Sequence, residues 1–356
     1  MIANQPEPSA PRPSEPLPSP RSWPRRIFRL AGVVGLGLVL LPPTIWAAAA
    51  LYFDVREPWM SGPLAGIYLL AVLAVWIFVK RRWWALGLTV GGFALVLGWW
   101  LTLQPSNDRN WRPDIAVLPY ADINGHNVTI HNIRNCDYRT ETDYDVRHYD
   151  KTLDLDKLRT LDLYMVYWGS PLIAHTMMSF GFEDGEQVCF SIETRNEQGE
   201  GYSAVKGLFR QFEITYVIAD ERDVVRLRTN YRQGEEVYLY RLRASPERIR
   251  ELFLAYLHRA NHLREQPEWY NAVTDNCTTA IRAQRAAADR APWDWRMLVN
   301  GRGDELLYER GALATNLPLA ELKERGHINT RARAADKAVD FSHLIRQGVP
   351  GMSEQP

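Results

Sequence analysis

Apolar and polar residues are distributed unevenly along the chain. Apolar residues dominate from Ile27 to Leu103, whereas charged residues recur every few positions from Gln104 onward. Three separate apolar runs precede this change: residues 27–53, 63–79 and 83–103. Each run reaches the roughly 17 residues that an α-helix needs to cross a bilayer. The pattern therefore predicts a membrane part with three transmembrane helices, followed by an aqueous domain.

Positive charge is placed unequally around these runs, which predicts their orientation. Four arginines lie at the start of the first run, and Lys80, Arg81 and Arg82 fill the connection between the second and the third. The other connection, "DVREPWMSG", carries a single basic residue. Because cytoplasmic loops are enriched in Lys and Arg, the N-terminus is expected inside and the large domain outside. A cleaved signal peptide is the alternative for the first run, although no A-x-A-like site follows a short apolar core.

These features divide the chain into three expected parts. Residues 1–25 begin with a stretch rich in proline and serine and are expected to form a disordered cytoplasmic tail. Residues 26–103 are the expected membrane region, and residues 104–356 the expected outer domain. The 356 residues include 42 basic and 42 acidic ones, so the overall charge gives no indication of a nucleic-acid partner.

Short segments of alternating apolar and polar residues predict β-strands in the outer domain. Residues 114–120 and 126–135 are typical of a hairpin around the turn "DING". Residues 214–243 predict three further strands, with a hairpin at "YRQGEE".

Helices are expected after these strands. Ser245 is a good N-cap for a helix that Pro267 limits. One apolar stripe runs along it: Ile249, Leu252, Phe253, Tyr256, Leu257, Ala260 and Leu263. A second helix is expected to begin around Cys277 and to stop near Pro292. Because strands and helices segregate, the expected fold class is α+β, with an antiparallel sheet packed on helices.

The stretch "TDNCTTAIRAQ", residues 274–284, places Cys277 where a loop rich in capping residues becomes a helix. Unpaired backbone N–H groups and the helix dipole favour an anion there, so the thiol is expected to have a lowered pKa. The same N–H groups can hold a developing oxyanion on an attacked carbonyl. Cys277 is therefore a candidate nucleophile. The alternative is a small buried cysteine that packs the helix start.

His126 and His131 lie in the first predicted hairpin, whereas His175 lies in another, "PLIAHTMMSFGFEDGEQVCFSIETR". Even-numbered apolar residues on its two strands are expected to face the core: Met178, Phe180, Phe182, Val188, Phe190 and Ile192. The alternation then puts His175 on the opposite face with Ser191, Glu193 and Arg195. An imidazole beside a carboxylate is what a cysteine nucleophile needs. A hairpin histidine exposed to solvent is the alternative.

Four further features bear on the chemistry. Cys189 shares the predicted face of His175, but it lies mid-strand without a helix dipole and ranks below Cys277. In an oxidising compartment two of the three cysteines (Cys136 is the third) could pair, and the sequence does not choose which. Neither H-E-x-x-H nor C-x-x-C occurs, so no metal site is expected, and no cofactor. "ERDVVRLRTNYR" places four arginines on predicted strands, either as lipid-phosphate ligands or as a solvated sheet face.

A family resemblance rests on these stretches, in this order: "PSNDRNW", "VTIHNIRNCDYRT", "AHTMMSFGFEDG", "SIETRNEQGEGYS", "ERDVVRLRTN", "YNAVTDNCTTAI" and "FSHLIRQGVPG". Across residues 105–351 they resemble the Lnb N-terminal periplasmic domain family of bacterial membrane proteins. That family is similar to the circularly permuted papain-like thiol enzymes, in which a histidine on a strand precedes a cysteine at a helix start. His175 and Cys277 match that order, and the third polar position is either Glu193 or Ser191.

The resemblance also implies a function, because the family's namesake is a lipoprotein N-acyltransferase. It implies a multi-pass protein of the bacterial inner membrane whose C-terminal, papain-like domain lies in the periplasm. A membrane lipid is the expected acyl donor, and an amine such as a lipoprotein N-terminus the expected acceptor. Cys277, His175 and Glu193 are the expected catalytic residues; Asn276, Thr278, Ser191 and Arg195 are expected to contact the substrate. The alternatives are a cysteine peptidase or amidase acting on cell-wall peptides, and a periplasmic binding domain without catalysis.

Overall fold

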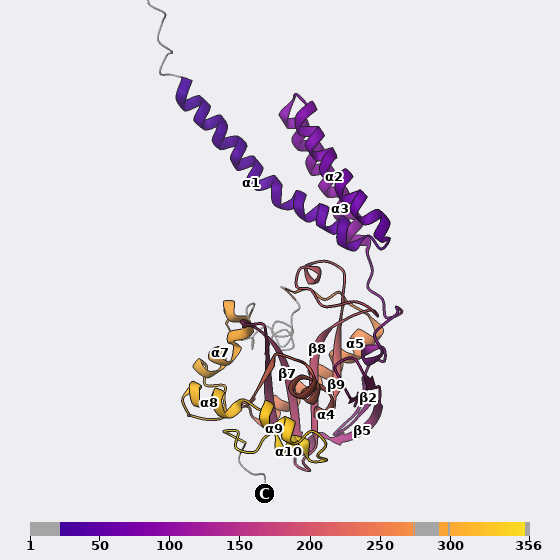
Figure 1. Ribbon diagram of the computed structural model, residues 1–356, viewed down its shortest axis with the longest axis vertical. Coiled ribbons are helices and arrows are strands. Elements are labelled where there is room, and N and C mark those ends of the chain that lie inside the picture. Colours follow the sequence, from indigo (N-terminus) through magenta and orange to yellow (C-terminus); the bar gives the residue numbers. More distant parts are fainter. Residues whose placement is uncertain (1–21, 273, 275–291, 298–299, 353–356) are drawn as a thin grey trace, which may run out of the picture. The chain divides into compact units, whose positions relative to one another are not determined.

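The structure is a computed structural model that describes residues 22–272, 274, 292–297 and 300–352 (Figure 1). The chain forms two compact units, Met1–Thr102 and Leu103–Pro356. The division falls next to the change from apolar to charged sequence.

Three long helices make up the first unit: α1 (Ser22–Asp54), α2 (Pro58–Phe78) and α3 (Arg82–Thr102). All three contain a stretch long and apolar enough to cross a membrane, which confirms the three predicted runs as helices. Their few polar side chains bond to one another: the Trp76 indole donates to Thr89 at 3.0 Å, and the Trp100 indole to Asp54 at 2.8 Å. Polar groups in the hydrocarbon region of a bilayer need such internal partners, because no water is present there to bind them.

The second unit is built on a mixed sheet of eight strands (Figure 1). The strands are β1 (Tyr120–Asn124), β2 (Asn127–Arg134), β5 (His148–Asp154), β6 (Leu158–Trp168), β7 (Ser170–Phe182), β8 (Gln187–Arg195), β9 (Glu213–Ala219) and β10 (Glu235–Arg241). Their order is β1-β2-β9-β8-β7-β6-β10, and β5 pairs with β2. Only β2 and β9 run parallel; the other pairs among these strands are antiparallel. A separate two-stranded sheet joins β3 (Asp137–Tyr138) to β4 (Tyr144–Asp145).

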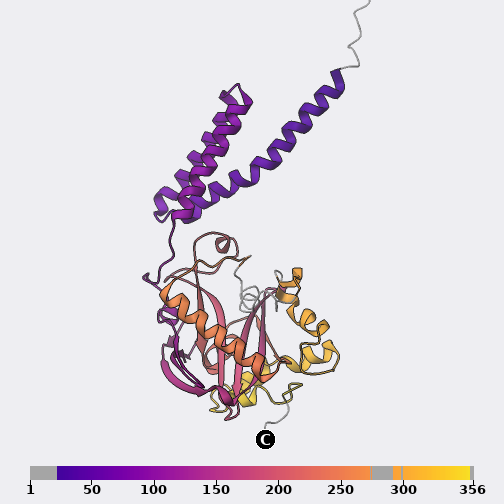
Figure 2. The ribbon, with the colours of Figure 1, turned by 180° about the vertical axis from the view of Figure 1, so that it is seen from behind.

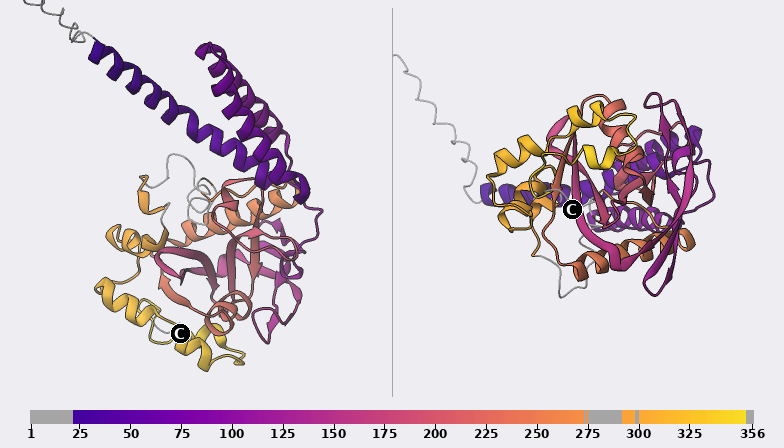
Figure 3. Two further views of the ribbon diagram at one scale, coloured as in Figure 1. Left: turned by 45° about the horizontal axis from the view of Figure 1, so that its top comes forward. Right: turned by 90° about the horizontal axis from the view of Figure 1, so that it is seen from below.

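Helices cover both faces of the large sheet. They are α4 (Glu221–Arg226), α5 (Pro246–Glu265), α7 (Gly303–Glu309), α8 (Leu319–Gly326), α9 (Asn329–Ala334) and α10 (Phe341–Leu344). Figure 2 shows α5 lying across one face, and the view from below in Figure 3 places the sheet between α5 and the C-terminal helices. The α+β class and the mostly antiparallel sheet predicted from the sequence are confirmed.

The face under α5 holds the larger apolar core. Ser245 caps α5 as predicted, its hydroxyl accepting from the backbone N–H of Arg248, and every residue of the predicted stripe is buried. Phe253 stands at the centre, with its ring edge-to-face against Phe180, Phe182 and Phe190. The opposite face of the sheet carries a second apolar core, in which Met177 and Cys189 pack with apolar residues of α4, α9 and α10. The middle of β7 is therefore held from both sides.

The first predicted hairpin is displaced along the chain. Residues 114–120 form no strand apart from Tyr120, and Pro113–Ile115 is a single 3-10 turn. Three residues of the expected turn "DING", residues 122–124, belong to β1 instead. The chain reverses at Gly125, whose φ of +64° favours glycine, so the turn needs fewer residues than expected.

The middle strand predicted between residues 214 and 243 is wrong. That segment is helical, as α4 followed by a π-helical turn at Leu227–Tyr231. The side chain of Asp220 accepts from the backbone N–H of Arg222 at 2.9 Å and caps the helix. Asp223 receives a bidentate bond from the buried Arg134 at 2.8 and 2.9 Å. Capping and this buried pair outweigh the β-branched pattern of the sequence.

Candidate functional site

The hairpin of β7 and β8 carries His175 as the sequence predicts. Met178 pairs with Phe190 and Phe180 with Val188, and all six predicted core residues lie in the core under α5. The odd-numbered residues face the other way. They bring His175 and Glu193, from two strands, to one side of the sheet.

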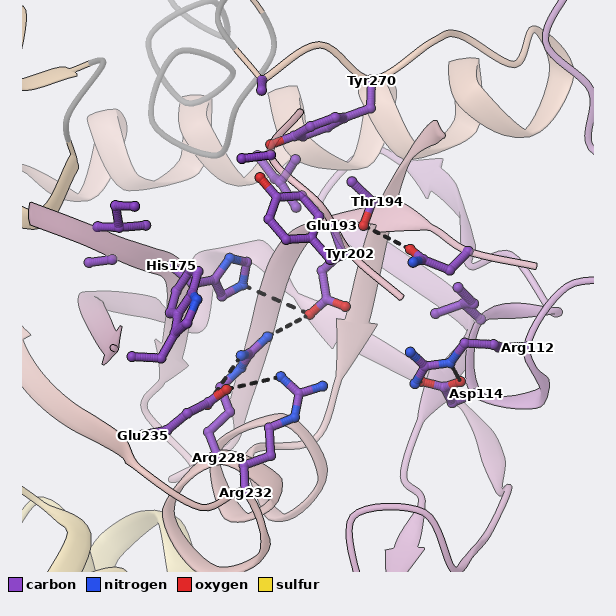
Figure 4. A pocket seen from close by; sticks show the side chains of 18 residues that line it. Arg112, Asp114, His175, Glu193, Thr194, Tyr202, Arg228, Arg232, Glu235 and Tyr270 are labelled. Carbon is purple, nitrogen blue, oxygen red and sulfur yellow. Dashed lines mark hydrogen bonds and ion pairs between the residues drawn. The ribbon is translucent and has the colours of Figure 1, made fainter. Parts of the chain in front are cut away.

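Figure 4 shows the imidazole of His175 beside the carboxylate of Glu193, and a serine, Ser191, joins the two groups by hydrogen bonds. His175 Nε2 lies 2.7 Å from Ser191 Oγ, and Ser191 Oγ donates to Glu193 Oε1 at 2.6 Å. The direct separation of His175 Nε2 and Glu193 Oε1 is 3.8 Å. The sequence left open whether Ser191 or Glu193 is the third polar residue. Both take part: Ser191 contacts the imidazole, and Glu193 contacts Ser191.

The single proton of the Ser191 hydroxyl fixes the direction of these bonds. An ionised carboxylate only accepts, so Ser191 gives its proton to Glu193. The Ser191 oxygen must then accept from the N–H at His175 Nε2. The neutral ring keeps its lone pair at Nδ1, which has no hydrogen-bond partner among the described residues. The arrangement thus presents an unprotonated ring nitrogen.

Arg228 supplies the charge that keeps Glu193 ionised. Its guanidinium lies between two carboxylates, 3.0 Å from Glu193 and 3.4 Å from Glu235. Burial opposes the charge of Glu193, but Arg228 and His175 lower the pKa of that carboxyl below its usual range. Burial, and next the charge of Arg228, lowers the pKa of His175 to about 3, and Glu193 offsets this only in part. His175 is accordingly neutral at physiological pH.

These groups line a cavity of about 380 Å³. Apolar and aromatic side chains form one part of its wall, among them Trp168, Ile173, Tyr202 and Tyr270. Charged side chains form another: Arg112 with Asp114, and Arg228 and Arg232 with Glu235. The combination of an apolar wall, paired charges and one free base suits an amphiphilic ligand.

Other predicted site residues do not meet here. Arg195 is buried outside the cavity, where its guanidinium donates to the carbonyl oxygens of Ile115 and Ala116 and stacks over the ring of Trp111. Three predicted residues lie outside the described part of the chain: Asn276, Cys277 and Thr278. So does the helix that was expected to begin there.

The two described cysteines are free and buried. Cys189 lies in the core on the far side of the sheet from α5, and burial raises the pKa of its thiol well above the usual value. Burial likewise raises the pKa of Cys136 to about 12. Neither thiol is a thiolate at neutral pH, and Cys189 is no rival nucleophile despite facing the same side as His175.

Sequence reasoning missed Arg228, Arg232 and Glu235. They follow His175 by more than fifty positions, and the four arginines of this segment were expected on strands. The four arginines lie on α4 and directly after it instead. Two of them, Arg226 and Arg228, are buried against carboxylates of the protein. A solvated sheet face is therefore wrong for these two. No group of His, Cys, Asp and Glu able to hold a metal ion occurs among the described residues.

Comparison with known families identifies this part of the chain. Residues 144–301 match the model of the Lnb N-terminal periplasmic domain, and no curated protein or solved structure matches the chain. The matched segment is shorter than the expected 105–351 but includes the complete hairpin of His175, Arg228 and the position of Cys277. Together with three apolar helices, it fits a membrane protein with a periplasmic domain. The resemblance to the Lnb N-terminal periplasmic domain family is thus confirmed over residues 144–301.

Proposed function

We propose that the protein is a membrane-anchored, thiol-dependent acyltransferase of the bacterial inner membrane. Cys277 is the nucleophile, His175 the general base and acid, and Ser191 with Glu193 orients the imidazole. The acyl donor is a membrane lipid, and the acceptor is an amine such as the N-terminus of a lipoprotein.

One observation carries the proposal: a neutral imidazole in the cavity wall is held through Nε2, and its Nδ1 has no hydrogen-bond partner within the described part of the chain. Tyr270 and Ala272 belong to the wall of that cavity. Cys277 follows Ala272 by five positions, and five extended residues span at most about 17 Å. A connection of this length allows the proposed contact between the thiol and the base.

The chemistry proceeds in two halves. His175 Nδ1 takes the proton of the Cys277 thiol, and the thiolate attacks the ester carbonyl of the lipid. The C–O bond to the lipid alcohol breaks, the alcohol leaves with the proton from His175, and a thioester remains. An amine then attacks the thioester, gives its proton to His175, and releases the thiol after the C–S bond breaks. Backbone N–H groups at the start of the expected helix hold the oxyanion.

The wall of the cavity is consistent with an amphiphilic donor. Trp168 and Ile173 can contact an acyl chain, and Arg112 and Arg232 can bind a polar or anionic headgroup. Each of these arginines is already paired with a carboxylate, so a headgroup phosphate has to share them.

The first test is acylation of Cys277. The full-length protein, incubated with phospholipid vesicles and digested, is expected to carry a fatty acyl thioester on the peptide that contains Cys277. Cys277→Ser is the control and is expected to carry no thioester. An unmodified Cys277 in protein that remains folded contradicts the proposal. A fatty acyl adduct that water removes as fast as an added amine contradicts acyl transfer and indicates hydrolysis of the lipid instead.

The serine bridge gives a second test with a matched control. Ser191→Ala removes the acceptor of His175 Nε2–H, and losing a hydrogen bond of this kind to a charged pair costs about 1.5–3 kcal/mol, or about tenfold to a hundredfold in acylation rate. Ser179 is the matched residue: it is equally buried and donates to Glu221 at 2.6 Å, but outside the cavity lining. Ser179→Ala should lose a similar amount of stability and keep its rate. Equal rates in the two variants argue against a role for the bridge.

A further inference from the structure

Large apolar side chains are exposed around the cavity. Among the described residues of the second unit, eleven such side chains are exposed, and eight of them lie on three short segments. The eight are Trp168, Leu172 and Ile173; Tyr202, Val205 and Leu208; and Trp293 and Trp295. We call them the apolar rim. The other three are single valines elsewhere: Val117, Val146 and Val339.

Two of the three segments adjoin the cavity. Trp168, Ile173 and Tyr202 line it directly. The segment of Val205 is tied to the wall by a bond from the backbone N–H of Ala272 to the carbonyl of Gly207, at 2.8 Å. The third segment is linked to the turn between β6 and β7: Arg302 lies over the ring of Trp295, and the carbonyl of Gly301 accepts from Tyr167 at 2.9 Å. The apolar rim therefore consists of two segments of the cavity wall and a third that is linked to the first of them.

The chain enters the second unit at this end. Leu103 is its first residue and is bonded to Thr102, the last residue of α3. The carbonyl of Leu103 accepts from Arg210 at 2.6 Å and from the indole of Trp269 at 3.3 Å. Arg210 follows Leu208 of the rim by two positions, and Trp269 precedes Tyr270 of the cavity wall. The chain therefore enters the second unit next to segments that carry the rim and the cavity wall, one peptide bond after the last residue of a helix that can cross a membrane.

The composition of the rim fits a lipid surface. All four exposed aromatic residues of the second unit belong to it, and Trp and Tyr favour the level of lipid headgroups. Residues 168–173 carry no charge, and residues 202–208 carry only Lys206, which can reach water or an anionic headgroup. A patch of this kind on a soluble domain marks an interaction site.

From these observations, we propose that the apolar rim docks into the outer surface of the bilayer that α1, α2 and α3 cross, so that the cavity opens at the level of the lipid headgroups. Val205 and Leu208 enter the acyl region, and the aromatic rings lie at the headgroups. A lipid then enters the cavity sideways from the membrane. The docking does not require the thiol chemistry, and it stands or falls separately from acyl transfer.

The test compares two exposed valines in full-length protein. Val205→Cys and Val339→Cys are each made in a Cys277→Ser background, where the native thiols at positions 136 and 189 are buried, and each new thiol is labelled with an environment-sensitive fluorophore. The proteins are reconstituted into vesicles of phosphatidylethanolamine and phosphatidylglycerol. Lipids with a spin label on the acyl chain are expected to quench most of the fluorescence at position 205 and little at position 339. Aqueous iodide should give the reverse order.

Three outcomes overturn the docking. Equal quenching at both positions by the spin-labelled lipids contradicts it, and so does free access of iodide to position 205. A probe at 205 that neither quencher reaches indicates that another protein, or a second copy of the chain, covers the rim instead. Leu208→Cys, labelled in the same way, provides a second position if Val205→Cys does not fold. Because every protein in this test lacks the thiol of Cys277, its result is independent of whether that thiol is acylated.

Discussion

His175→Ala is expected to lower the rate of Cys277 acylation by about 10²–10⁴-fold, the usual contribution of a general acid and base. The variant leaves the thiol without an acceptor for its proton and the departing alcohol without a donor. His131→Ala is the matched control, because His131 also lies on a strand between acidic side chains, Asp122 and Asp150, but outside the cavity lining. The measurement is the initial rate of thioester formation, followed by mass spectrometry. A rate within a few-fold of the wild type removes His175 from the mechanism.

The lowered pKa of His175 predicts a particular pH dependence of stability and of the acylation rate. A purely structural role of His175 would not produce it. Its folded pKa is about 3, below the ordinary value of 6.5. Between these values the unfolded chain binds a proton that the folded protein does not, so stability falls as the pH drops from about 6.5 toward 3. His175→Ala should therefore lose less stability than the wild type over this range. In the wild type, protonation of His175 should not cause an acid limb near pH 6.5 in the acylation rate; a limb there contradicts a neutral, buried imidazole.

Arg346→Met is expected to lower the free energy of unfolding by about 3–5 kcal/mol, because it leaves buried carboxylates without their cation. Arg346 binds Glu221 through two bonds of 2.7 Å and Asp162 through one of 2.9 Å. Both carboxylates are fully buried, and Arg241 also contacts Asp162. Denaturant unfolding of the full-length protein in detergent measures the change.

The double variant Glu221→Gln with Arg346→Met separates a charge effect from lost packing. Removing the stranded charge should recover part of the loss, so the double variant should be more stable than Arg346→Met alone. Burial opposes ionisation of Glu221, but Arg346 lowers the pKa of Glu221 below its usual 4.5. The pair therefore contributes its stability above about pH 4.5 and loses it as the pH falls further. A double variant no more stable than the single one assigns the loss to packing.

The hairpin of β7 and β8 could be predicted because the pattern that defines it is local. Six apolar residues at every second position define the core face, and the alternation then assigns the face of His175, Ser191 and Glu193 without knowledge of the remaining fold. The three apolar helices were predictable for a similar reason, since length and composition suffice.

The surroundings of the hairpin could not be predicted in this way. "DVVRLRTNY" has the β-branched and alternating character of a strand, yet it is helical because Asp220 caps it and Arg134 reaches Asp223 from another strand. Arg228 meets Glu193 only after that helix forms. For the same reason the role of Arg346, in the stretch "FSHLIRQGVPG", was invisible until its three partners from β6, α4 and β8 were seen together.

The position of Leu103 beside the apolar rim has a consequence for how donor lipids reach the cavity. A domain that docks on the bilayer through its apolar rim, as proposed, meets molecules that travel in the plane of the membrane. Encounter then becomes a two-dimensional process. The number of donor molecules per unit area, rather than their amount per volume of cell, sets how often the cavity is filled.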